Sequence, residues 1–143
     1  RFLEYVLNVR AQITNATVLG EEFGRFSLDI LHKERILKYW YKLKSSQGSL
    51  INIIFRYQVE NNIVYFWPSY VQNLLNDIGF NFLWTSENVT KSQLAKVIVR
   101  LHDQYYQQWN TTVTNSPKLS TYNLIKGDQF NFQKYLDCAI IDK

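Results

Sequence analysis

The sequence predicts an all-α protein, built as a single domain of about five to seven helices. Glycine and proline are scarce, with five and two residues in a chain of 143. Few positions therefore suit the tight turns that join the strands of sandwiches and barrels. Apolar residues recur at helical spacing in several stretches. The length is that of one domain with a sizeable core, expected to span residues 1–143.

Capping signals support the helices that this spacing predicts. Ser27 is the expected N-cap of the helix that follows it, and Thr90 that of the last long helix. Gly79 is expected to end the helix before it. The predicted helices cover residues 2–9, 16–23, 28–44, 50–59, 68–78 and 91–111.

Residues 50–67 allow two interpretations. Residues 50–59 and 63–67 are rich in β-branched and aromatic side chains, and the ENN segment between them suits the turn of a short β-hairpin. Leu50, Ile54 and Tyr57 also fit helical spacing. A helix is favoured here, with the hairpin as the alternative.

The predicted helix over residues 28–44 has an apolar face and a basic face. At about 100° per residue, its large apolar side chains share one side: Ile36, Leu37, Trp40 and Leu43. The opposite side carries Arg35, Lys38 and Lys42, in a stripe about 60° wide. Solvation is the commonest role of such a stripe, and binding of phosphates is the functional alternative.

Aromatic residues are abundant, at 16% of the chain. Exposed rings beside cations can stack on single-stranded bases, but rings at helical spacing are more often part of the core. Trp40 and Trp109 are expected inside. Tyr39, Tyr41 and Tyr106 are the candidates for exposure.

Composition excludes several classes of site. The net charge of +4 and the pI of about 9.1 are compatible with a nucleic-acid partner but not diagnostic of one. Cys138 is the single cysteine, so neither an intrachain disulfide nor a zinc-binding spacing is present. No apolar run approaches the ~20 residues of a membrane-spanning helix. No metal and no membrane are therefore expected.

No combination of residues predicts catalysis. Two-metal chemistry needs carboxylates held close together, whereas Glu21 and Glu22 are adjacent on a predicted helix and point about 100° apart. His32 and His102 are isolated histidines, and Cys138 pairs with one of them only if the fold brings them together. No phosphate-binding glycine loop or dinucleotide motif occurs. The chain is therefore expected to have no catalytic residues and no cofactor, and not to be an enzyme by itself.

Five blocks of sequence follow one another along the chain. They are GEEFGRFSL at 20–28, KYWYKL at 38–43, W-x3-V-x2-LL…GF at 67–80, SPKLSTY at 116–122 and FNFQKYLD at 130–137. These blocks resemble, in the same order, the helical region C-terminal to the polymerase core of animal non-LTR (LINE-type) retrotransposon reverse transcriptases. Two departures occur: one extra residue separates the glycines of the first block, and Ser27 stands where the family usually has proline.

The resemblance implies a fragment of a longer retroelement-derived polyprotein, in which the catalytic carboxylates lie upstream. It implies a non-catalytic helical segment that supports RNA or DNA binding by the polymerase. The implied partners are RNA or an RNA–DNA hybrid and the remainder of the parent polypeptide, in the cytoplasm or the nucleus. The residues expected to bind nucleic acid are Arg25, Arg35, Lys38, Lys42, Lys118 and Lys126.

Two alternatives remain open at this level. One is a helical protein-interaction or scaffold module, which an exposed apolar patch and a dispersed positive field would favour. The other is a decayed retroelement fragment without a selected function, which suits the two departures from the family pattern.

Overall fold

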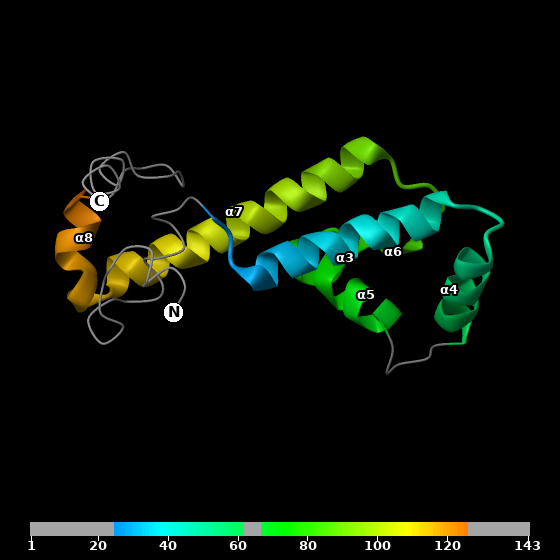
Figure 1. Cartoon of the computed structure of the whole chain (residues 1–143), viewed down its shortest axis with the longest axis horizontal. Coiled ribbons are helices and arrows are strands. Elements are labelled where there is room, and N and C mark those ends of the chain that lie inside the picture. The colour runs from blue at the N-terminus through cyan, green and yellow to red at the C-terminus, as the bar shows by residue number, and fades with distance from the viewer. Residues whose placement is uncertain (1–24, 62–66, 126–143) are drawn as a thin grey trace, which may run out of the picture. The chain divides into compact units, whose positions relative to one another are not determined.

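A computed structural model describes residues 25–61 and 67–125 (Figure 1). The described residues are 82% helical and contain no strand, so the all-α prediction is confirmed. The helices predicted over residues 2–9 and 16–23 lie outside the described residues. The observed helices are α3 (Leu28–Ser45), α4 (Leu50–Glu60), α5 (Trp67–Ile78), α6 (Phe82–Thr85), α7 (Lys91–Asn115), the 3-10 helix η1 (Pro117–Leu119) and α8 (Ser120–Ile125).

The chain forms two compact units. One comprises Leu28–Gln104, and the other comprises Arg1–Ser27 with Tyr105–Lys143. Helix α7 contributes its first part to the former and its second part to the latter. The extent of a single domain over residues 1–143 stays a prediction. The unit Leu28–Gln104 is called the central unit below.

The apolar stripes of α3, α5 and α7 form the core of the central unit. All four predicted core residues of α3 are buried, and Leu37 and Trp40 have no exposed surface. Helix α3 lies beside the first part of α7 in Figure 1. The apolar stripes of the other two helices are also buried: Val71, Leu74, Leu75 and Ile78 in α5, and Leu94, Val97 and Leu101 in α7.

Residues 50–60 form helix α4, which confirms the favoured interpretation and makes the hairpin alternative wrong for this stretch. The hydroxyl of Ser49 accepts a hydrogen bond from the Asn52 backbone N–H at 3.2 Å, which caps the helix. Gly48, with φ of +79°, provides the left-handed turn before the cap. Local capping therefore selects the helix over the strand propensity of its side chains.

Helix α7 is longer than predicted, because it continues to Asn115. Its start is confirmed: Thr90 Oγ1 accepts from the Gln93 N–H at 3.2 Å, and Gln93 Oε1 accepts from the Thr90 N–H at 2.8 Å. The hydroxyls of Thr111 and Thr112 donate to the carbonyls four residues earlier, which satisfies these side chains within the last turns.

The other unit has a small core of its own. Trp109, Val113 and Leu119 are buried together, and Tyr106 and Tyr122 pack against them. The rings of Tyr106 and Trp109 stack with centroids 6.0 Å apart. The burial of Trp109 is confirmed, whereas Tyr106 is only partly exposed.

Candidate nucleic-acid interface

The basic face of α3 carries Arg35, Lys38 and Lys42, and all three side chains are exposed. Successive members are three and four residues apart, which aligns side chains along one side of a helix. They lie opposite the buried residues of α3. We refer to these three residues as the α3 stripe.

Ion pairs reduce the charge that α3 offers to a ligand. Lys33 Nζ lies 2.7 Å from Asp29 Oδ2, and Lys38 pairs with Glu34. Arg35 and Lys42 form no ion pair with another described residue. The full positive charge of the α3 stripe is therefore carried by its two ends, and the charge of Lys38 is partly balanced.

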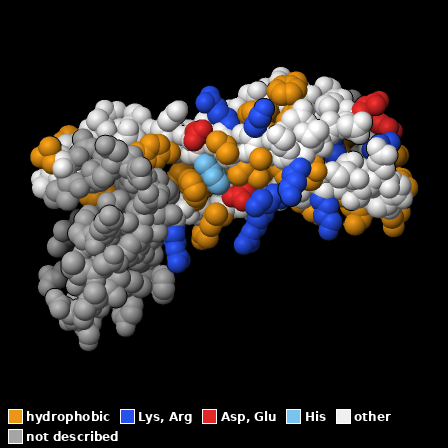
Figure 2. Space-filling view, turned by 90° about the horizontal axis from the view of Figure 1, so that it is seen from above, with side chains coloured by type: hydrophobic (Ala, Val, Ile, Leu, Met, Phe, Trp, Pro, Cys, Tyr) orange, Lys and Arg blue, Asp and Glu red, His pale blue; other side chains and the backbone are white. Residues whose placement is uncertain are grey.

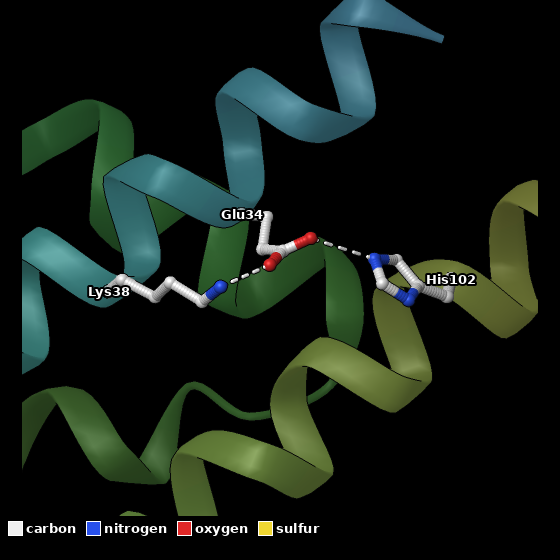
Figure 3. A network of polar contacts seen from close by, with 3 residues as sticks. All are labelled: Glu34, Lys38 and His102. Atoms are coloured by element: carbon white, nitrogen blue, oxygen red, sulfur yellow. Dashed lines mark hydrogen bonds and ion pairs between the residues drawn. The ribbon is translucent and has the colours of Figure 1, made fainter. Parts of the chain in front are cut away.

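Glu34 joins α3 to α7 through a polar network that the sequence did not predict (Figure 3). Its Oε2 lies 3.1 Å from His102 Nε2, and its other oxygen pairs with Lys38. The Glu34 side chain is only 17% exposed. The bond from Lys38 lowers the pKa of Glu34, burial opposes this shift, and the contact with His102 adds to it. The network connects Lys38 of the α3 stripe to α7 through Glu34.

Lys44 has a structural role that its position at the end of the predicted helix over residues 28–44 does not indicate. Its ammonium donates to the carbonyls of Leu83, Trp84 and Ser86 at 3.0, 2.6 and 2.7 Å. It also lies 5.4 Å from the ring centre of Trp40. Burial lowers the pKa of Lys44, and the three carbonyls accept hydrogen bonds from its ammonium. Lys44 thus ties the end of α3 to α6 and is not available as a phosphate ligand.

Aromatic rings form a continuous series through the central unit. Tyr39 meets Trp67 edge to face at 5.4 Å, Trp67 meets Phe55 at 6.1 Å, and Phe55 meets Trp84 at 5.9 Å. Tyr39 is 46% exposed, as expected for a ring that could stack on a base. Tyr41, the other candidate on α3, is only partly exposed.

The remaining predicted residues lie outside the central unit or outside the described residues. Arg25 and Lys118 are exposed, but both belong to the unit that contains Tyr105–Lys143. Lys126 lies outside the described residues. In Figure 2, Lys and Arg side chains project at separate points of one face, with hydrophobic side chains between them. The structure therefore groups three of the six predicted residues.

Helix α4 presents an apolar face to solvent that the sequence did not identify. Only Asn52 and Phe55 of this helix are buried. Its exposed apolar side chains include Leu50 at 72% and Tyr57 at 61%. The full set is Leu50, Ile51, Ile53, Ile54 and Tyr57. We call it the α4 apolar face.

Searches of protein families, curated proteins and solved structures find no match to this chain. Within the described ranges, no three His, Cys, Asp or Glu side chains are grouped as metal ligands would be. None of the helices in that part of the chain has both the length and the apolar character needed to cross a membrane.

Proposed function

We propose that this chain is a non-catalytic helical segment of a retrotransposon reverse transcriptase-like protein that binds the phosphate backbone of RNA or an RNA–DNA hybrid. It would do so as part of a longer polypeptide, in the cytoplasm or the nucleus. The observation that carries the proposal is the α3 stripe, whose end cations Arg35 and Lys42 are exposed and unpaired among the described residues. The family resemblance supplies the nature of the ligand.

The geometry of the stripe suits a phosphate backbone. Lys42 lies seven positions after Arg35, which corresponds to about 10 Å along the helix axis. Two flexible cationic side chains at this separation can each meet a phosphate of one strand, and each such contact releases a counterion. Tyr39, exposed on the same helix, offers a ring to an unpaired base.

The test is RNA binding at several salt concentrations by the variant Arg35→Glu with Lys42→Glu. We expect weaker binding and a salt dependence of log K that is shallower by about 1 to 2 units, because two phosphate contacts are lost. Lys38 is left unchanged, because a glutamate at this position would lie one turn from Glu34 and the two carboxylates would repel each other.

The matched control is Lys91→Glu with Lys96→Glu, which makes the same charge change at exposed positions of α7. A larger loss in the α3 variant supports the stripe. Equal losses in both variants would show that only net charge matters, and unchanged affinity in the α3 variant would refute the proposal.

The α4 apolar face favours protein interaction as a second candidate function. Clustered exposed apolar side chains mark interaction surfaces. A helix of eleven residues is about 16 Å long, and two copies crossing through it would bury less than the roughly 1,200 Å² of a stable interface. The occupant we infer is therefore an apolar surface of a larger protein partner, such as another part of the parent polypeptide.

The corresponding test is Ile53→Lys with Tyr57→Lys, measured by binding to the purified polymerase region of a related retroelement protein. We expect this variant to lose binding while its thermal unfolding is unchanged, because neither side chain is buried. Retained binding would exclude this face. A wild-type chain that dimerises through α4 in light-scattering measurements would instead identify a second copy as the occupant.

A further inference from the structure

A cavity of about 390 Å³ lies in the central unit, between α4, the end of α3, and α6 with the segment that follows it. Its volume falls within the range of small-molecule sites. The residues of α4 that line it are Asn52, Phe55, Arg56, Val59 and Glu60, which share one side of that helix. This side of α4 therefore brings both polar and apolar side chains to the cavity.

Two aromatic rings form a corner of the cavity. Phe55 and Trp84 both line it, with ring centres 5.9 Å apart and planes at 84°. A flat ring entering this corner can stack on one of them and meet the edge of the other, and both are favourable aromatic geometries. The corner therefore suits a planar ligand about the size of one heterocycle.

Buried hydrogen bonds hold the walls of the cavity. Lys44 fixes the α6 side through the carbonyls described above. On the α4 side, Asn52 Nδ2 donates to the Leu43 carbonyl at 2.6 Å. Walls held in this way form the cavity before a ligand arrives, which reduces the cost of ordering on binding.

The cavity also offers polar groups suited to a heterocycle. Asn52 is only 3% exposed, and its amide oxygen accepts no hydrogen bond from another described residue. An amide oxygen that lines a cavity can accept a hydrogen bond from a ligand N–H group. Asn88 and Gln47 add further amides to the lining. The amides and the ring corner together match the edge and the face of a nucleobase.

Charged groups of both signs surround this corner. Arg56 lines the cavity and forms no ion pair with another described residue, so its guanidinium can bind a phosphate. Glu60 and Glu87 also line it, and carboxylates accept hydrogen bonds from hydroxyl and amino groups. The mixed charges favour a ligand with one phosphate over one with several.

We infer that this cavity binds a single unpaired nucleobase together with its phosphate, with the base in the Phe55–Trp84 corner and the phosphate on Arg56. The inference rests on the proposed function in one respect, since it takes the base from the single-stranded part of a bound RNA. It adds a base-binding site to the phosphate contacts of α3.

The test is NMR of the 143-residue chain titrated with each of four ribonucleoside monophosphates, with ribose 5-phosphate and inorganic phosphate as probes without a base. We expect saturable shifts of the Trp84 indole and the Asn52 and Asn88 side-chain amides with nucleotides only. Resonances of the Trp84 indole are assigned from Trp84→Phe.

Arg56→Gln is expected to weaken nucleotide binding about tenfold, because a charge-assisted bond is lost, and to leave nucleoside binding unchanged. Arg100→Gln, at an exposed position of α7, is the control. NMR shifts that are confined to Arg56 and that inorganic phosphate alone reproduces would overturn the base site. Nucleotide-induced shifts confined to α3 would overturn it as well. Saturation of the cavity by an aromatic peptide but not by nucleotides would also overturn it.

The two proposals fail separately. Loss of RNA binding in the α3 variant without nucleotide shifts at the cavity would retain the stripe and reject the cavity inference. Nucleotide shifts at the cavity, together with unchanged RNA binding by the α3 variant, would retain the cavity inference and reject the stripe.

Discussion

Helices α3 and α4 belong to the same unit but differ in where most of their apolar side chains lie. Helix α3 buries its apolar face and leaves its cations in solvent. Helix α4 buries Asn52 and Phe55 and exposes a row of isoleucine, leucine and tyrosine side chains. Periodicity therefore predicts both helices, but it identifies the buried side only for α3. Which side of an amphipathic helix is buried depends on the side chains that the neighbouring elements pack against it.

The largest expected effect on stability comes from comparing a buried side chain of α3 with an exposed side chain of α4. Leu37→Ala in α3 should destabilise the protein by about 2–5 kcal/mol, because the side chain is fully buried and its removal leaves a cavity. Ile53→Ala in α4 should change the free energy of unfolding by less than about 0.5 kcal/mol, because the side chain is 56% exposed. Denaturant unfolding measures both. A large loss in the α4 variant would mean that its apolar face is covered.

A smaller effect is expected at the junction between α3 and α6. Lys44→Met should cost about 1.5–3 kcal/mol, because three carbonyls lose a charged donor while the aliphatic contacts are kept. Lys42→Met is the matched control two residues earlier, and it should be nearly neutral because that side chain is exposed. Thermal unfolding of the two variants measures the difference in stability between them. Equal stabilities would show that Lys44 does not join these elements.

The smallest effect concerns the contact between α3 and α7. Glu34→Gln should cost about 0.5–1 kcal/mol at neutral pH. The pKa of Glu34 in the folded protein is lowered from 4.5, so its ionised form contributes stability above that value, and this contribution is lost as the pH falls through the lowered pKa. Unfolding followed against pH should show the wild type and the variant converging in acid. A constant difference between them would contradict the role of the carboxylate.

The α3 stripe could be predicted from sequence because it depends on local geometry alone. The spacing of Arg35, Lys38 and Lys42 determines their shared side once the helix forms. Their pairing could not be predicted in full. Lys38 meets Glu34 within one turn. His102 is 68 residues from Glu34, and nothing in the local sequence indicates that these two side chains meet.

The aromatic residues show the same division. Trp40 lies at the centre of the apolar side of α3, and its burial follows from that position. Tyr41 and Tyr106 were expected to be exposed, but both are partly covered. The ring of Tyr106 stacks on Trp109 one turn away, and this contact within α7 covers part of the ring.

By itself, the sequence determined the all-α class, the start of α7 at Thr90, the end of α5 before Gly79, and the basic side of α3, because these depend on residues within one or two turns of each other. Tertiary structure alone decided that Lys44 binds the carbonyls of α6, that Asn52 is buried against Leu43, and that one side of α4 lines a cavity. Each of these needs a partner from a different element. The packing of whole helices, and not the pattern of any one, brings such partners together.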